Sequence, residues 1–119
     1  DWPTLDGTGV RDYIHVMDLA EAHVRTLEFM KSSKSQNLSL NIGTGKGTTV
    51  LELVHTFERI NKIKIPYIIE SRRNGDVARL VADNSLLKKK LNWFPKRSLE
   101  EMCKDGWKWQ SLNLKGFEK

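Results

Sequence analysis

Apolar residues recur at helical spacing in two long stretches of the chain. In the first, Asp18 can accept hydrogen bonds from the amides of a first helical turn, and the spacing that follows predicts a helix over residues 19–31. Its apolar positions are Ala20, Val24, Leu27 and Met30. In the second, Thr49 and Glu52 have the spacing of a capping box, in which hydroxyl and carboxylate each accept a hydrogen bond from an otherwise unpaired amide. This signal predicts a helix over residues 50–62.

Two further helices are expected later in the chain. Residues 83–91 read as a short helix, and its lysine run, Lys88 to Lys90, is typical of a solvated helix face. Ser98 and Glu101 repeat the capping-box spacing and open a last helix. The apolar side of that helix holds Leu99, Met102, Cys103 and Trp107.

Strand signals are fewer and shorter. Residues 13–17 favour a short extended segment, and residues 38–42 alternate apolar and polar side chains into a glycine turn after a polar linker over 32–37. Residues 65–69 are rich in strand-favouring side chains, with a proline near the start that suits a sheet edge. The order of elements predicts an α/β or α+β fold with a small mixed sheet and about four helices.

Length, charge and cysteine content narrow the possible classes of protein. The chain has 119 residues and 13.7 kDa, which suits one domain or a piece of a larger protein, and its start at Asp1 suggests an excised segment. Its apolar runs are too short to cross a bilayer. A net charge of +5 favours anionic ligands. The single cysteine, Cys103, cannot form an internal disulfide and is expected on the buried side of a helix, in a reducing, cytoplasmic setting.

The turn from Gly43 to Gly47 lies where phosphate-binding loops occur, between a predicted strand and a predicted helix. Its spacing fits neither the dinucleotide fingerprint nor the nucleoside triphosphate loop, so a plain turn is expected. The histidines, His15, His23 and His55, fall on separate elements without the spacing of metal ligands. We expect no metal site, and we expect His15 to be a partly buried histidine with its hydrogen bonds satisfied.

Arginines in two loops are the stronger candidates for ligand binding. Arg11 follows a glycine-rich loop, and Arg72 and Arg73 precede Asp76 in a turn. A guanidinium grips phosphate oxygens with two hydrogen bonds, and an aspartate can accept hydrogen bonds from sugar hydroxyls, so the set suits a sugar nucleotide. Exposed loop arginines are, however, usually solvated or paired with surface acids, and a free-standing basic module that binds nucleic acid or another polyanion is a competing function.

Several of these motifs together resemble UDP-glucose 4-epimerases, which are members of the extended short-chain dehydrogenase/reductase family. The stretch from Pro3 to Ala20 is similar to the segment that opens the final third of those enzymes. The resemblance continues through Asn41 to Gly45, Arg72 to Asp76, Ala82 and Asp83, Leu91 to Trp93, and Asp105 to Gln110. It implies that residues 1–119 are the carboxy-terminal UDP-sugar-binding portion of such an enzyme, without the amino-terminal NAD-binding Rossmann domain.

The resemblance also assigns roles to individual residues. It implies that Arg11 and Arg73 contact the diphosphate of UDP-glucose or UDP-galactose and that Asp76 binds the ribose. The turn at residues 43–47 is then not the NAD loop, since NAD belongs to the missing portion. The parent enzyme is expected to be a homodimer that binds neither nucleic acid nor membrane, and its severed portion is expected to expose apolar surface.

One position departs from the pattern. Leu80 stands where many of these epimerases carry a tyrosine that narrows the hexose pocket. A smaller side chain there leaves more room, so the resemblance leads to the hypothesis that N-acetylhexosamines are tolerated.

The chain is expected to be inactive alone, because the family's catalytic pair is a Tyr-x-x-x-Lys motif. Tyr13 is followed four residues later by Met17, and Tyr67 is followed by Ser71. Purified residues 1–119, incubated with UDP-glucose and NAD, should therefore yield no UDP-galactose by chromatography. NAD-dependent turnover by this species would show that the assignment of the missing chemistry is wrong.

Overall fold

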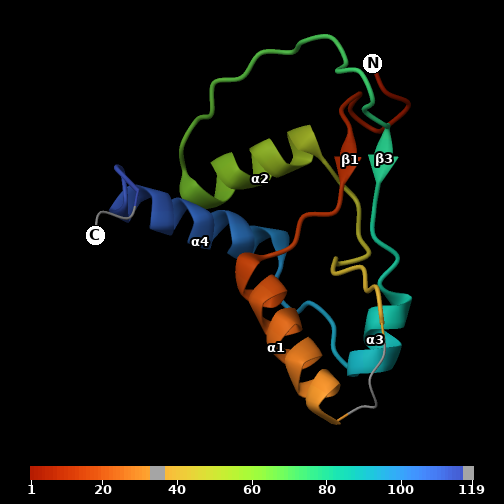
Figure 1. Ribbon diagram of the computed structural model, residues 1–119. Coiled ribbons are helices and arrows are strands. Elements are labelled where there is room, and N and C mark those ends of the chain that lie inside the picture. The colour runs from red at the N-terminus through yellow and green to blue at the C-terminus, as the bar shows by residue number, and fades with distance from the viewer. Residues whose placement is uncertain (33–36, 117–119) are drawn as a thin grey trace.

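The computed structural model describes residues 1–32 and 37–116, which form four helices and three short strands. The helices are α1 (Val16–Ser32), α2 (Val50–Asn61), α3 (Ser85–Leu91) and α4 (Leu99–Leu112), and the strands are β1 (Val10–Arg11), β2 (Thr48–Thr49) and β3 (Arg79–Leu80). Figure 1 shows α2 and α4 packed together, with α1 and α3 forming the opposite arm below the strands. None of the described helices is both long enough and apolar enough to cross a membrane.

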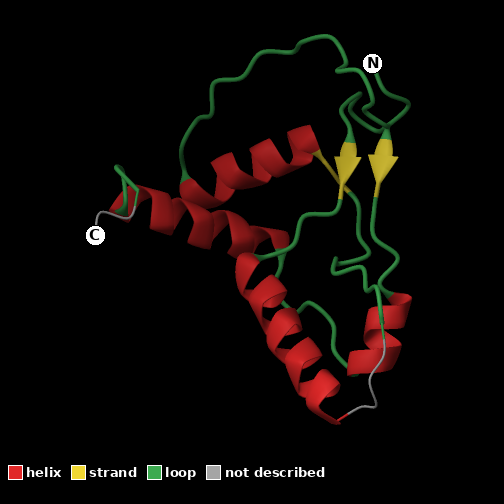
Figure 2. Ribbon diagram, in the orientation of Figure 1, coloured by secondary structure: helices red, strands yellow, loops and turns green. Residues whose placement is uncertain are grey.

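The sheet is small and mixed, as predicted. Strand β1 lies in the centre, antiparallel to β2 and parallel to β3 (Figure 2). Each strand contributes only two residues. The predicted fold class is therefore confirmed, although the strands lie at positions that the sequence pattern did not indicate.

All three predicted strand segments were wrong. Residues 13–15 lack strand structure, and residues 16 and 17 form the first turn of α1. Residues 38–42 keep the alternation of half-buried and exposed side chains but pair with no strand in the described chain, and residues 65–69 are also unpaired. An alternation of apolar and polar side chains indicates that one face of an extended segment is covered. A strand also requires a neighbouring strand that pairs with its backbone N–H and C=O groups. The described residues supply no such neighbour.

All four predicted helices are confirmed, with bounds shifted by a few residues. Both capping boxes form: the Thr49 side chain accepts from Glu52 N at 3.1 Å, and Ser98 accepts from Glu101 N at 3.2 Å. Helix α1 begins before the predicted residue 19, because Asp18 is not its cap. The predicted linker over 32–37 lies mostly outside the described residues.

His15 occupies the capping place at α1 instead. The Met17 amide donates to His15 Nδ1 at 3.0 Å, and His15 Nε2 lies 3.2 Å from Asp105 Oδ2 on α4. The ring is buried, so the prediction of a satisfied, buried histidine is confirmed. This side chain joins the start of α1 to α4.

The core is small for a chain of this length. Its centre is Ala22, Leu87 and Trp93, against which Leu40, Ile42 and Leu91 pack. A second contact joins α2 to α4, where Phe57 and Trp107 meet edge to face at 6.1 Å. The radius of gyration is 17.1 Å, whereas a self-contained domain of this length is expected near about 13–14 Å. The molecule is accordingly open rather than closed around one centre.

Much of the apolar stripe that predicted α1 is exposed. Val24 is 55% exposed, Leu27 59% and Met30 62%, while the buried residues of α1 are Asp18 and Ala22. Helix α1 turns its polar Asp18 inward to a hydrogen-bonded site, and these three apolar side chains remain largely uncovered by the described residues. Exposed apolar surface was expected of this chain, and α1 carries a continuous strip of it.

Asp18 ties α1 to the segment that precedes α4. Its carboxylate accepts hydrogen bonds from the Lys96 amide at 3.0 Å, from the Arg97 amide at 2.9 Å and from the Arg97 guanidinium. Arg97 also donates to Glu21 at 3.0 Å. Burial alone raises the pKa of Asp18, but these hydrogen bonds outweigh it, so its pKa lies below the ordinary range. The ionised carboxylate is thus the form that the fold stabilises.

Replacing Asp18 should destabilise the fold in a pH-dependent way. Asp18→Ala leaves Arg97 without its buried partner and should lower the free energy of unfolding at pH 7 by about 2–4 kcal/mol. Because the folded-state pKa is depressed, this contribution is present above the unfolded pKa of about 4 and disappears as the pH falls below it. Urea unfolding at pH 7 and pH 3 measures both effects.

The control is Glu28→Ala on the same helix, since the Glu28–Arg25 pair is exposed. It should change the free energy of unfolding by less than about 0.5 kcal/mol. A cost for Asp18→Ala that is the same at both pH values would contradict the assignment.

Candidate functional site

The site is built where β1 and β3 run side by side. Arg11 on β1 and Leu80 on β3 are register partners in the parallel pair. The turn that precedes β3 brings Arg73 and Asp76 to the same place, although they are more than 60 residues away from Arg11 in the sequence. The strands therefore bring the two predicted arginine loops together.

One carboxylate joins both arginines. Asp76 Oδ1 lies 3.4 Å from Arg11 Nη2, and Asp76 Oδ2 lies 3.2 Å from Arg73 Nε. Arg11 is fixed further by donating from Nη1 to the carbonyls of Val10 at 2.8 Å and Val77 at 3.0 Å. Arg73 has no such additional bonds within the described chain, and its side chain is 85% exposed. Its terminal nitrogens are therefore open to an incoming anion.

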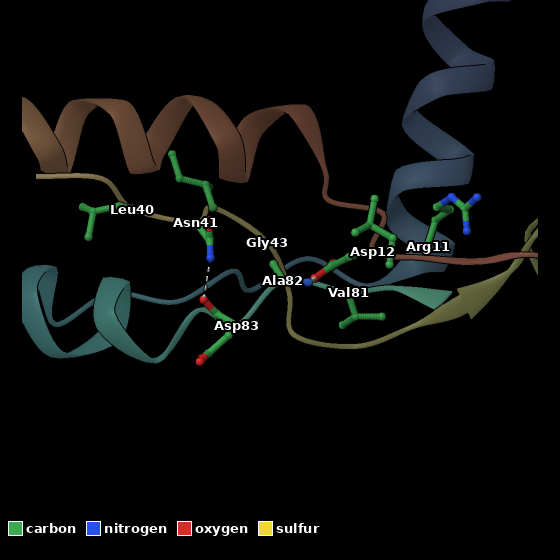
Figure 3. A pocket seen from close by; sticks show the side chains of 10 residues that line it. Arg11, Asp12, Leu40, Asn41, Gly43, Val81, Ala82 and Asp83 are labelled. Atoms are coloured by element: carbon green, nitrogen blue, oxygen red, sulfur yellow. Dashed lines mark hydrogen bonds between the residues drawn. The ribbon is translucent and has the colours of Figure 1, made fainter. Parts of the chain in front are cut away.

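Two neighbouring cavities meet at the Arg11–Asp76 contact. The first, of about 500 Å³, is open, and Arg11 lines it (Figure 3). Leu80 lines the same cavity. Its other lining residues are Asp12, Leu40, Asn41, Ile42, Gly43, Val81, Ala82 and Asp83. The second, of about 250 Å³, is lined by Trp2, Arg73 and Asp76 among others. Arg11 and Leu80 thus line the first cavity, and Arg73 and Asp76 line the second. The Arg11–Asp76 ion pair links the two groups of residues.

Asp12 was missed at the sequence level and is the most connected side chain of the site. Its Oδ1 accepts from the amide of Thr44 at 2.9 Å and from the Thr44 hydroxyl at 2.5 Å. Its Oδ2 accepts from the amides of Gly45 at 2.9 Å and Ala82 at 3.3 Å. Figure 3 shows the Asp12 carboxylate pointing toward Ala82. A sequence signal did exist, because free amides in a glycine turn need an acceptor, but it did not say which carboxylate supplies it.

These bonds also decide what the glycine turn does. The amides of Thr44 and Gly45, which could otherwise bind a phosphate, already donate to Asp12. The turn over residues 43–47 is therefore a structural turn, as predicted, although no strand precedes it. In the described part of the chain, no three His, Cys, Asp or Glu side chains gather into a possible metal site.

Charge and burial nearby are consistent with an anion site. Burial raises the pKa of the Tyr13 phenol against the opposing effect of Arg11, so Tyr13 remains neutral beside that guanidinium. Arg11 and Arg73 share one carboxylate, Asp76, whereas Arg72 is paired with Asp1. The open guanidinium nitrogens of Arg73 are suited to phosphate oxygens.

Helices beside a small mixed sheet, with paired arginines at the strand edge, define a protein of mixed α and β structure with a candidate anion site, and the comparisons identify the family. A family model described as GDP-mannose 4,6 dehydratase matches residues 3–106, so the chain belongs to that family. The UDP-glucose 4-epimerase of Bacillus subtilis (strain 168) is 51% identical over 99% of this chain. The resemblance seen in the sequence motifs is thereby confirmed.

Solved structures agree. A UDP-glucose 4-epimerase from Stenotrophomonas maltophila, with bound NAD and formylated UDP-arabinopyranose, superposes with a TM-score of 0.89 at 48% identity over 94% of this chain. One from Bifidobacterium longum, in complex with NAD+ and UDP, gives a TM-score of 0.91 at 42% identity over 98% of this chain. The chain spans about a third of the length of these relatives: 34% of the Bacillus protein, 33% of the Stenotrophomonas chain and 34% of the Bifidobacterium chain.

The packing around Asp12 predicts a large contrast between two glycines. A Cβ at Gly43 would lie 2.6 Å from Ala82 Cβ and 2.7 Å from Asp12 Oδ2, whereas a Cβ at Gly106 in α4 would meet nothing within 4 Å. Gly43→Ala should therefore destabilise the fold by about 1–3 kcal/mol. Gly106→Ala should stabilise it by about 0.5–1 kcal/mol through helix propensity. Thermal unfolding of the two variants tests this, and similar melting temperatures would show that Asp12 does not hold these loops tightly.

Proposed function

We propose that residues 1–119 form the carboxy-terminal, UDP-sugar-binding part of a UDP-glucose 4-epimerase, an isomerase that interconverts UDP-glucose and UDP-galactose. The observation that carries this proposal is the convergence of Arg11 and Arg73 on Asp76. Two guanidinium groups held side by side suit two adjacent phosphates better than one, because each can take a separate group of oxygens. The family match and the NAD and UDP ligands named for the relatives support the same substrate class.

In this proposal the residues of the chain bind and orient the substrate. Arg11 and Arg73 contact the diphosphate, with Asp76 holding the two guanidinium groups in place and accepting a hydrogen bond from the ribose. Arg11 is held by two carbonyl oxygens, so little side-chain entropy is lost when it binds a phosphate. The exposed terminal nitrogens of Arg73 supply the more mobile contact.

The glycine turn over residues 43–47, which most resembles a phosphate cradle, does not fit NAD. The amides of Thr44 and Gly45 already donate to Asp12, and Gly43 lies so close to Ala82 that an added Cβ would be 2.6 Å from Ala82 Cβ. In the epimerase, NAD takes hydride from the sugar and later returns it. We assign NAD binding and the catalytic Tyr-x-x-x-Lys pair to an amino-terminal Rossmann domain outside residues 1–119.

The same domain accounts for the open shape. The exposed stripe of α1 at Val24, Leu27 and Met30, together with the unpaired segment 38–42, offers an apolar surface and free backbone groups. A Rossmann domain packed there would cover both, since stable domains bury such surface. We further propose that the complete protein is a cytoplasmic homodimer that binds neither nucleic acid nor membrane.

Titration with two anions tests the proposal. UDP added to isotope-labelled residues 1–119 should shift backbone NMR signals near Arg11 and Arg73, because those two guanidinium groups already lie together at Asp76. In the full-length protein, Arg11→Ala and Arg73→Ala should each weaken UDP binding by roughly tenfold or more, the loss of one charge-assisted contact. The matched control, Arg25→Ala, removes an exposed arginine on α1 that pairs with Glu28 and should leave UDP affinity unchanged.

Single-stranded RNA provides the opposing arm of the titration. Signal shifts near Arg11 and Arg73 with RNA and none with UDP would favour the basic polyanion-binding module instead. Equal UDP affinity in the arginine variants would remove the proposed diphosphate site.

Leu80 supplies a test of substrate range. This residue is 63% exposed and lines the same cavity as Arg11. We propose that this leaves room for an N-acetyl group, so the full-length protein should turn over both UDP-glucose and UDP-N-acetylglucosamine. Leu80→Tyr should reduce turnover of the acetylated sugar selectively. Absence of activity on UDP-N-acetylglucosamine in the unaltered protein would refute this hypothesis.

A further inference from the structure

A long connection carries half of the proposed site. Between the end of α2 and β3 the chain runs without helix or strand, and Figure 1 shows it arching away from the body of the molecule. Residues 66–75 are exposed throughout. Arg73, whose guanidinium is proposed to bind the diphosphate, lies near the far end of this exposed segment.

Arg72 provides the only hydrogen bonds that tie residues 66–75 to another segment of the described chain, apart from the Arg73–Asp76 turn itself. Its Nε donates to Asp1 Oδ1 at 2.6 Å, and its Nη2 donates to the Asp1 carbonyl at 2.5 Å. The guanidinium carbon lies 3.8 Å from the centre of the Trp2 ring, in the geometry of a cation–π contact.

The platform under Arg72 is itself fixed. The Trp2 amide donates to the Gly7 carbonyl at 3.0 Å, and the Thr4 hydroxyl donates to the Thr8 carbonyl at 2.7 Å, so the amino-terminal loop is closed on itself. The loop is also attached to the start of α2, where the Leu51 amide donates to the Thr8 hydroxyl at 3.3 Å. The Trp2 ring, on which the Arg72 guanidinium stacks, is therefore part of a hydrogen-bonded loop.

The two neighbouring arginines are used differently. The Arg72 fork is occupied by Asp1 and its face by Trp2, whereas the terminal nitrogens of Arg73 make no hydrogen bond in the described chain. We propose that Arg72 is a positioning residue: it latches the 66–75 segment onto Trp2 and thereby holds Arg73 and Asp76 opposite Arg11. This proposal rests on the proposed function only for the identity of the ligand.

The physical basis of the latch is conformational entropy. A segment of ten exposed residues with few hydrogen bonds to the rest of the described chain samples many arrangements, and a ligand that needs one of them binds less tightly for that reason. Fixing the segment beforehand removes that loss. The effect of Arg72 on binding should therefore be transmitted through Arg73, not through a contact of its own.

Backbone order measures the latch without any ligand. In residues 1–119, NMR relaxation should give order parameters for residues 73–76 that fall below about 0.6 in Arg72→Ala, from values nearer a rigid backbone in the unaltered chain. The matched control, Lys64→Ala, removes an exposed cation from the other end of the connection, and it should leave those values unchanged. Unchanged order in Arg72→Ala would overturn the proposal.

UDP affinity in the full-length protein measures the consequence. Arg72→Ala should weaken UDP binding roughly 3- to 10-fold, and Arg72→Lys should recover only part of the loss because an ammonium lacks the planar fork. In the Arg73→Ala background, Arg72→Ala should have little further effect. Full additivity would mean that Arg72 contacts the phosphates itself, which contradicts a positioning role.

The two proposals fail in different ways. If the unaltered full-length protein does not bind UDP, the proposed function is wrong, and the order parameters of Arg72→Ala still decide whether the latch exists. If UDP binds and Arg72→Ala leaves its affinity unchanged, the latch is wrong while the proposed function stands.

Discussion

The carboxylate of Asp12 joins three segments of the chain at one point of the site. It accepts hydrogen bonds from Thr44, Gly45 and Ala82, so the end of β1, the glycine turn and the segment after β3 meet at two oxygen atoms. The strands that flank this point are only two residues long. Arg11 immediately precedes Asp12. The direction in which the Arg11 side chain points therefore depends on the hydrogen bonds that the Asp12 carboxylate accepts.

Two other aspartates join separate segments in the same way. Asp18 joins α1 to the segment before α4, and Asp76 joins the two arginine loops. Among the described residues, the buried apolar cluster around Leu87 is small, and a second apolar contact joins α2 to α4. Because ionised carboxylates make directional bonds and apolar contacts do not, these aspartates set the geometry of the site more narrowly than the core could.

Sequence reasoning succeeded where the signal was local. The capping boxes at Thr49 and Ser98 depend on residues three apart, and both helices begin where those signals indicate. It failed at residues 38–42 and 65–69, since a strand depends on a distant partner that no local pattern reveals. At the site, arginine chemistry and family resemblance selected Arg11, Arg73 and Asp76, and the fold brings them together. Asp12 was overlooked because an aspartate beside a surface arginine looks like an ordinary ion pair until the turn that it binds is known.

The unstructured connection between α2 and β3 has a consequence for how this chain tolerates change in length. Its middle contacts no buried element through a hydrogen bond, and its ends are held separately, at Glu58 with Ile65 on one side and at Arg72 on the other. Closing a longer loop costs only a slowly growing entropy, about 0.6 kcal/mol for each doubling. Insertions and deletions between residues 66 and 71 should therefore accumulate among relatives without disturbing either helix pair, whereas the spacing from residue 72 to residue 76 is constrained by the atoms that must meet there.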